Sequence, residues 1–234
     1  MNDILTVRTT LVSFHVLRDS CGLYLIDTGF VGGRKALDKA LQKRGWEKEA
    51  ILGILITHGH LDHILNVGNL AAETGAWIAA PRLDCAPYKG KPCYKGASRV
   101  IGVMEAIGRP LLGFQPFMPD RMLDDGDTLD IWHGLRAVHL PGHTAGHMGY
   151  YCEKLDLLFA ADLFASYRRF SHLPPVFFNS DSGEIPNSIR KALHLEAKGV
   201  IPNHGDVASP EDHLERLKRI SFKASSIPLL GGGR

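Results

Sequence analysis

The chain has 234 residues, of which 44% are hydrophobic and 22% charged, and its formal net charge is +2 with histidine neutral. A chain of this length can form one large domain and bury most of the surface that it exposes when unfolded, so folding needs no disulfide framework. The near-neutral charge gives no indication of a nucleic-acid partner, and no apolar run reaches the roughly 20 residues needed to cross a bilayer. We therefore expect one domain over residues 1–234, with no nucleic-acid or membrane partner.

The N-terminus and the cysteines bear on the cellular compartment. The first ten residues lack the basic region and long apolar core of a signal peptide. The four cysteines are far apart and form no CxxC pair: Cys21, Cys85, Cys93 and Cys152. We therefore expect a cytoplasmic protein whose cysteines are free thiols.

Short apolar or alternating runs predict strands, and apolar residues at helical spacing predict helices. Strands are predicted within 4–27 and at 51–57, 76–80, 128–131, 136–140, 148–152, 155–160 and 199–201. Helices are predicted at 32–44, 63–74, 98–107, 184–197 and 211–223. Two groups of strands with helices between and after them indicate two sheets packed face to face, with helices outside.

Three segments need a separate interpretation. Residues 81–120 are rich in Pro, Gly, Lys and aromatic residues. We interpret them as a lid or pocket wall, or alternatively as a surface insertion that packs its aromatic side chains on the body. The acidic run 124–127 lacks the later ligands of a calcium loop and predicts a hairpin turn. Residues 224–234 end in GGGR and are expected to form a frayed tail.

The strongest chemical signal is the run HGHLDH at 58–63, directly after the predicted strand 51–57. Its His58, His60, Asp62 and His63 offer imidazole nitrogens and a carboxylate, which are ligands that zinc accepts. Four such groups cannot all reach one ion from a regular strand or helix, but on a tight loop they can divide between two neighbouring ions. For this run alone, a solvated polar loop is the alternative.

The same arrangement recurs along the chain. The predicted strands 136–140, 155–160 and 199–201 lead into loops that carry His143, Asp162 and His204, in that order. Strand ends along one edge of a layered fold converge in space. The sequence therefore predicts a cleft lined with metal ligands.

Five motifs, in this order, resemble those of the metallo-β-lactamase superfamily: LYLIDTG at 23–29, THGHLDH at 57–63, LPGHTAGH at 140–147, AAD at 160–162 and PNHGD at 202–206. The resemblance extends over essentially the full length. It implies an α/β (α+β) fold, a four-layer αββα sandwich, with a dinuclear metal site at one edge.

Position by position, the resemblance also implies a role for each candidate residue. The first ion would be held by His58, His60 and His143, the second by Asp62, His63 and His204, and Asp162 would bridge the two. Asp27 would lie beneath the site and fix a ligand or loop by hydrogen bonding.

The implied activity is hydrolysis of a small-molecule substrate. Two divalent ions, most readily zinc with iron or manganese also compatible, would provide a metal-bound hydroxide that attacks a small ester, lactone or thioester. Asp62 would orient the hydroxide and take its proton as a catalytic residue. Tyr167 and Arg168 are candidates for substrate binding, with a solvated loop as the alternative.

Other functions remain open at this point. Hydrolases of the glyoxalase II kind add a substrate-binding domain after the last ligand, and the thirty residues after His204 are too few for one, so we do not expect that identity. A phosphodiesterase acting on a small phosphodiester is an alternative, because the same site serves that chemistry in related proteins. A non-catalytic metal-binding sensor is another, although a degenerate site would usually have lost some ligands.

Overall fold

The computed structural model describes residues 3–92 and 94–225, with side chains described as far as residue 221. Cys93 and residues 226–234, most of the predicted tail, lie outside the described residues. Cys21, Cys85 and Cys152 are free thiols, as expected. Among the described helices, none combines the length and apolar character needed to cross a bilayer.

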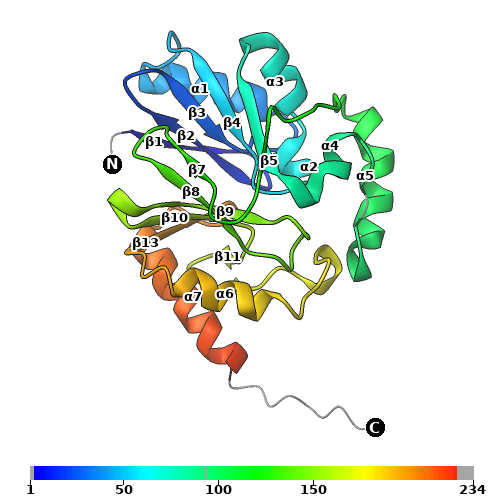
Figure 1. Ribbon diagram of the computed structural model, residues 1–234, viewed down its shortest axis with the longest axis vertical. Helices are drawn as coiled ribbons and strands as arrows, with labels where there is room; N and C mark the ends of the chain where they lie inside the picture. The colour runs from blue at the N-terminus through cyan, green and yellow to red at the C-terminus, as the bar shows by residue number, and fades with distance from the viewer. Residues whose placement is uncertain (1–2, 93, 226–234) are drawn as a thin grey trace.

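Two β-sheets form the centre of the molecule (Figure 1). In the first sheet the strand order is β1 (Ile4–Arg8), β2 (Ser13–Arg18), β3 (Leu23–Ile26), β4 (Ile51–Leu55), β5 (Trp77–Pro81) and β6 (Arg121–Leu123). In the second it is β13 (Gly199–Pro202), β10 (Leu157–Ala161), β9 (Met148–Cys152), β8 (Leu135–His139) and β7 (Thr128–Leu129). Strands β3 to β6 are parallel, as are β10 and β13, so these strands end at a common edge of their sheet.

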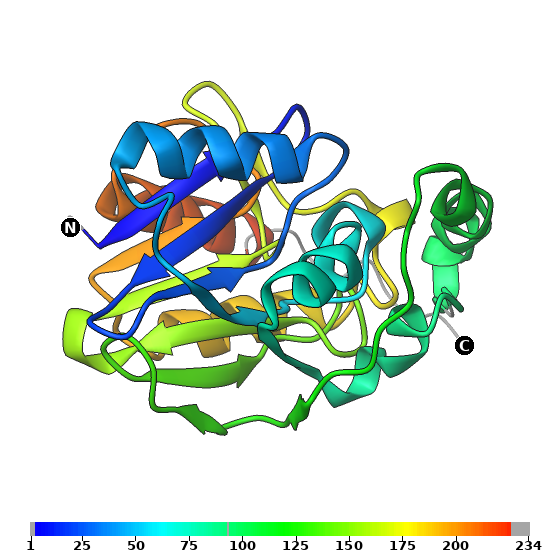
Figure 2. The ribbon, with the colours of Figure 1, turned by 90° about the horizontal axis from the view of Figure 1, so that it is seen from above.

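Helices cover the outer faces of both sheets (Figures 1 and 2): α1 (Gly33–Arg44) and α3 (Val67–Thr74) lie on the first sheet, and α6 (Ile185–Leu193) and α7 (Pro210–Ser225) lie on the second. The other helices, α2 (Leu61–Ile64), α4 (Cys85–Tyr88) and α5 (Arg99–Leu111), lie beside the sheets, with α5 farthest out. Short 3-10 helices lie at Arg82–Asp84, Gly96–Ser98, Glu153–Leu155 and Val176–Phe178, and a two-stranded ribbon is formed by β11 (Ala165–Ser166) and β12 (Ser171–His172). The predicted αββα sandwich is confirmed.

Three hydrophobic clusters correspond to the three interfaces between the four layers. In β3, Leu25 faces the cluster beneath α1 and α3, whereas Ile26 faces the cluster between the sheets. Strand residues point alternately to opposite faces, so a strand that is buried on both sides is apolar throughout. A third cluster joins the second sheet to α6 and α7, for example through Leu158 and Leu217.

Two local predictions are wrong. The helix expected at 63–74 is divided into α2 and α3, because the side-chain amide of Asn66 donates to the carbonyl oxygens of Thr28, Gly29 and Phe30 at 3.0–3.2 Å.

The turn at 124–127 is not a hairpin, because β6 belongs to the first sheet and β7 to the second. This turn instead carries the chain from one sheet to the other.

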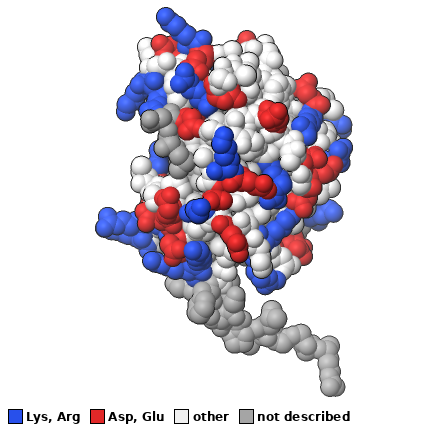
Figure 3. Space-filling view, turned by 60° about the vertical axis from the view of Figure 1, so that its left-hand side comes forward, with Lys and Arg blue, Asp and Glu red and all other residues white. Residues whose placement is uncertain are grey.

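On the face shown in Figure 3, Lys and Arg side chains are interspersed with Asp and Glu side chains. This mixed pattern differs from the continuous basic stripe that is typical of proteins that bind nucleic acids.

One buried hydrogen bond ties the two sheets together, and its loss should be measurable. The hydroxyl of Tyr150, on β9, donates to the carbonyl oxygen of Ile56, just after β4, at 2.7 Å. Tyr150→Phe leaves that carbonyl without this donor, so we expect the free energy of unfolding in urea to fall by about 1–2 kcal/mol. As a control, Tyr151→Phe removes weaker contacts of 3.3 and 3.5 Å and should cost less. Equal losses in the free energy of unfolding for the two variants would contradict a stabilising role for the Tyr150–Ile56 hydrogen bond.

Candidate metal centre

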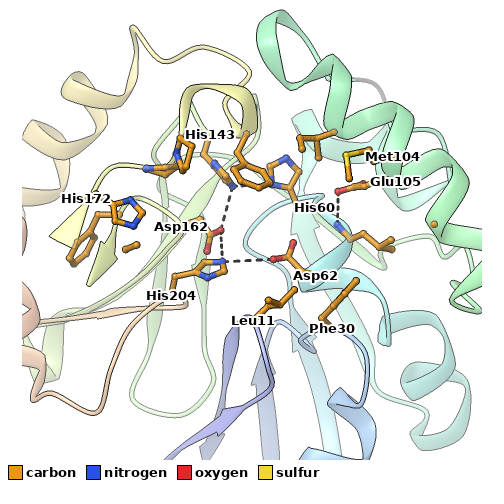
Figure 4. Close-up of a pocket in the computed structure, with 18 of the residues that line it drawn as sticks. Leu11, Phe30, His60, Asp62, Met104, Glu105, His143, Asp162, His172 and His204 are labelled. Atoms are coloured by element: carbon orange, nitrogen blue, oxygen red, sulfur yellow. Dashed lines mark hydrogen bonds and ion pairs between the residues drawn. The ribbon is translucent and has the colours of Figure 1, made fainter. Parts of the chain in front are cut away.

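The seven residues predicted as metal ligands lie together at one edge of the sandwich. Figure 4 labels five of them: His60, Asp62, His143, Asp162 and His204. Each follows the carboxyl end of a strand: β4 leads to the HGHLDH loop and α2, β8 to His143, β10 to Asp162 and β13 to His204. Three overlapping groups each have their candidate ligand atoms within 4.8 Å of one another. The groups are His58–His60–His143, His58–His63–Asp162 and Asp62–His63–His204.

The carboxylate of Asp162 is at the centre of this cluster. Its Oδ2 atom is 3.1 Å from Nε2 of His204, and 3.4 Å from Nε2 of both His63 and His143. Nε2 of His58 is 4.0 Å away. One carboxylate therefore faces imidazole groups from both candidate ion positions.

The cluster favours positive charge near its carboxylates. Burial lowers the pKa of His58 and His60 well below the usual value, so both rings are neutral and each keeps a lone pair. Burial opposes charge on His63 as well, but the carboxylates of Asp162 and Asp62 outweigh it and raise the pKa of His63 well above its usual value. A cation in the cluster would supply the charge that these carboxylates attract.

Several buried atoms of the cluster lack any hydrogen-bond partner. Among the described side chains, they are Nε2 of His58, His60 and His63 and Oδ1 of Asp162; Nε of Arg109 is the other unpartnered atom. Leaving a buried polar atom unpaired costs about 1–3 kcal/mol, so such atoms are rare. Imidazole nitrogens and a carboxylate oxygen are also the donors that divalent transition metals prefer. The residues present therefore fit a metal site.

Asp27 lies directly beneath the HGHLDH loop, at the position expected from the sequence. Its carboxylate accepts hydrogen bonds from Nδ1 of His63 at 2.9 Å, from the backbone and hydroxyl of Thr57 at 2.8 and 2.7 Å, and from the amide of Asn203 at 2.6 Å. The Thr57 hydroxyl in turn lies 3.0 Å from Nδ1 of His58 and can accept its proton. Asp27 thus orients two rings so that their Nε2 atoms face the cluster.

Two residues next to this network have a left-handed backbone. They are Asp27, with φ 63°, and Ala161, with φ 48°, directly before Asp162. This conformation is costly for residues other than glycine, and it tends to persist where surrounding contacts hold a functional side chain in place.

Asp84 connects the two loops that carry His60 and His143, and sequence reasoning missed it. Its carboxylate accepts from the backbone N–H of Gly59 at 2.9 Å, from the hydroxyl of Thr144 at 2.6 Å and from the backbone N–H of Gly146 at 2.8 Å. These partners are distant in sequence from Asp84, so no local pattern indicated the role.

A buried ion pair on α5 fixes the same loop from the other side. Glu105 accepts from the backbone N–H of Leu61 at 2.9 Å and pairs with Arg109 at 2.7 Å. Arg109 also donates to the carbonyl oxygen of Gly59 at 3.2 Å, and the hydroxyl of Tyr94 donates to that same oxygen at 2.9 Å. The segment 81–120 therefore supports the loop directly.

Two further residues position candidate ligands from the second sheet. His147, for which no role was predicted, is buried; burial lowers its pKa to about 3, so the ring is neutral. Its Nε2 accepts the backbone N–H of Asp162 at 3.1 Å. The side-chain oxygen of Asn179 lies 3.1 Å from Nδ1 of His143 and leaves Nε2 of that ring facing the cluster.

The cluster forms the floor of a cavity of about 600 Å³. Of the two candidates for substrate binding, Tyr167 lines this cavity, whereas Arg168 is exposed and is not among the lining residues. His172 lines the cavity as well (Figure 4). In the segment 81–120, α5 forms part of the wall, while Tyr88, Phe114 and Phe117 pack into the core. Both interpretations of this segment thus describe part of it.

Asp84→Asn tests the bridge between the two loops. The amide would place a donor against groups that themselves donate, so we expect a loss of about 2–3 kcal/mol in the free energy of unfolding. The affinity for a divalent cation should fall about 10–100-fold in calorimetric titration. Asp38→Asn, at an exposed ion pair on α1, is the matched control and should change neither quantity appreciably. An unchanged cation affinity in the Asp84 variant would rule out the bridging role.

The network beneath the site should make metal-free protein sensitive to acid. Burial lowers the pKa of His15 from 6.5 to about 4, and its ring contacts the side-chain oxygen of Asn203 at 3.2 Å. Between these values the unfolded chain binds a proton that the folded protein does not, so stability falls as pH drops from 6.5 towards 4. In the His15→Gln variant, the free energy of unfolding should fall by up to about 3 kcal/mol less over this pH range than in the wild type. Urea unfolding at several pH values measures the difference. His194→Gln, at an exposed site, should leave the pH dependence of stability unchanged. If this variant reduced the pH dependence as much as His15→Gln, the attribution to His15 would be wrong.

Comparisons of sequence and structure relate this chain to one family of known proteins. The family model described as the metallo-beta-lactamase superfamily matches residues 8–204. A hydroxyacylglutathione hydrolase of Chelativorans sp. (strain BNC1) is 30% identical over 171 residues, covering 71% of this chain and 52% of that protein. A Bacillus subtilis (strain 168) protein named probable metallo-hydrolase YflN is 23% identical over 247 residues, covering 95% of this chain and 90% of that protein.

The chain spans about half the length, or less, of the first hydroxyacylglutathione hydrolases that it matches, with 52%, 40% and 42% of three of them covered. The crystal structure of a metallo-beta-lactamase family protein from Thermus thermophilus superimposes with a TM-score of 0.72 at 21% identity, covering 97% of this chain and 80% of that one. The family match includes the positions of all seven clustered residues. This chain therefore belongs to the metallo-β-lactamase superfamily.

Proposed function

We propose that the protein is a metal-dependent hydrolase that holds two divalent ions and cleaves a small ester, lactone or thioester. The observation that carries the proposal is the cluster of seven ligand-type side chains, with unpartnered buried ligand atoms, on the floor of a cavity. Free thiols at Cys21, Cys85 and Cys152 fit the reducing cytoplasm that we propose as its compartment.

The geometry supports a division of the ligands between two ions. His58, His60 and His143 would hold the first, and Asp62, His63 and His204 the second. Asp162 faces both groups and would bridge them. We propose zinc as the metal, with iron or manganese as the other candidates, because mixed imidazole and carboxylate ligands accept all three.

When bound, such ions lower the pKa of water and polarise the scissile carbonyl. The side chain of Asp62 reaches both the ligand cluster and the cavity: its Oδ2 is 3.7 Å from Nε2 of His63, and it lines the cavity wall. Asp62 can therefore accept the proton of the attacking water and return it to the leaving oxygen or sulfur. Water adds to the carbonyl carbon, the bond to the leaving atom breaks, and the products are an acid and an alcohol or thiol.

Two observations favour a carbonyl over a phosphodiester substrate. Among the described residues that line the cavity, none is Lys or Arg, so no such side chain is available beside the ions to bind the remaining charge of a phosphate. The relative named hydroxyacylglutathione hydrolase supports acyl chemistry, and the relative named metallo-hydrolase supports hydrolysis at a metal.

Metal analysis and two ligand variants test this function. Purified protein should bind about two equivalents of metal per chain, and activity on esters, lactones or thioesters should vanish with a chelator and return with metal. His60→Ala and Asp162→Ala should each lose metal and lower kcat/KM by at least about a thousandfold. His194→Ala, at an exposed helix end, is the control and should retain both. Full activity of either ligand variant would refute the site.

A further inference from the structure

The wall of the cavity is far more apolar than its floor. Ile101, Met104 and Gly108 of α5, and Leu112 directly after it, line the cavity at the spacing of one helix face. The facing wall is also apolar and includes Phe164, Ala165, Pro174, Pro175 and Phe178. Figure 4 shows Met104, on the α5 side of the cavity, near His60. A substrate bound at the cluster would therefore extend between two apolar surfaces.

On the α5 side, the wall side chains are not part of the protein's own core, whereas Phe164 on the facing wall belongs to the cluster beneath α6 and α7. Met104 is 64% exposed and Leu112 is 41% exposed, and neither belongs to the three hydrophobic clusters. The polar pair on the same helix, Glu105 and Arg109, is buried against the HGHLDH loop instead. Apolar side chains that stay solvated at a cleft gain free energy when an apolar ligand covers them.

The charges around the cavity argue against an ionic substituent on the bound group. The basic side chains among its described lining residues are histidines, and His172 is the one outside the proposed ligand set. Of the lining carboxylates, those of Asp62 and Asp162 belong to the proposed ligand set, and that of Glu105 is held by Arg109 and the backbone N–H of Leu61. Away from the ligand cluster, the described wall therefore offers no fixed Lys or Arg cation to replace the hydration that a charged substituent would lose.

Gly108 leaves open space in this wall. A Cβ atom at this position would lie 3.7 Å from Cδ2 of Leu61 and 3.9 Å from Cδ1 of Leu112, both ordinary contacts with cavity-lining residues. Alanine would therefore fit the fold, and glycine is a poor helix former in the interior of α5. Gly108 thus lowers the stability of α5 but leaves room in the cavity. We therefore explain glycine at this position by the space that it leaves for a ligand.

From these observations we propose that the substrate carries an uncharged apolar acyl group that lies against α5, and that Gly108 sets the size of that group. The inference rests on the proposed hydrolase function and names the substrate class for the same site. Longer acyl chains cover more of the wall, so the cavity selects for them until it is filled.

The activity test is a series of 4-nitrophenyl esters from acetate to decanoate on metal-loaded protein. For the wild type, kcat/KM should rise about threefold per added methylene until the cavity is full. Gly108→Met should lower kcat/KM for the octanoate at least about tenfold and change that for the acetate by no more than about twofold. Gly108→Ala should show a smaller loss in the same direction. Val103→Met, exposed on the same helix and outside the lining, is the matched control and should behave as wild type.

A binding test decides the proposal independently of catalysis. N-phenyl-1-naphthylamine, a neutral apolar fluorophore, should bind metal-free protein and be displaced by octan-1-ol. Gly108→Met should weaken its binding at least about tenfold, and Val103→Met should not. Absence of binding, or equal binding by both variants, would overturn the apolar acyl site. Hydrolysis of the acetate without a chain-length preference would overturn it too while leaving the hydrolase function intact; binding without any metal-dependent hydrolysis would instead overturn the proposed function.

Discussion

The arrangement of this site depends on one buried carboxylate. Asp27 accepts hydrogen bonds from Thr57, His63 and Asn203, and so joins the ends of β3, β4 and β13. A buried carboxylate is stable only when its oxygens are satisfied, so these donors are held in fixed positions around it. The ring of His63 and, through Thr57, that of His58 are oriented by the same constraint. Asp27 therefore ties the candidate ligand cluster to both sheets, which the hydrogen bond between Tyr150 and Ile56 also joins.

Polar contacts fix the remaining ligand loops, and they come from elements far apart in the chain. Asp84 spans the loops of His60 and His143, and His147 holds the backbone of Asp162. The apolar layers place the strand ends within reach of one another, while these polar bridges set the side-chain directions. Packing thus determines where the site lies, and hydrogen bonding determines how it is oriented.

The parts of the structure that could be predicted from sequence are those that depend on local patterns. Buried strands are recognisable by composition, and each ligand follows such a strand, so the clustering of His58, His143, Asp162 and His204 could be anticipated. Asp84 and Asn179 could not, because their partners are separated from them by dozens of residues and nothing local marks a buried acceptor. The break at Asn66 was missed for a similar reason, since its amide binds carbonyl groups of a distant turn. The inward position of His172 depends on a short ribbon that has no clear strand pattern.

Helix α5 is attached to the rest of the protein in an unusual way. Its polar pair, Glu105 and Arg109, contacts the loop beneath it. The apolar side chains of Ile101 and Met104, and of Leu112 just after the helix, lie outside the hydrophobic clusters. Substitutions among these three should therefore disturb the packing of the sandwich very little. New specificities can then evolve by exchanging wall residues one at a time, without the loss of folding that usually accompanies change near a catalytic centre.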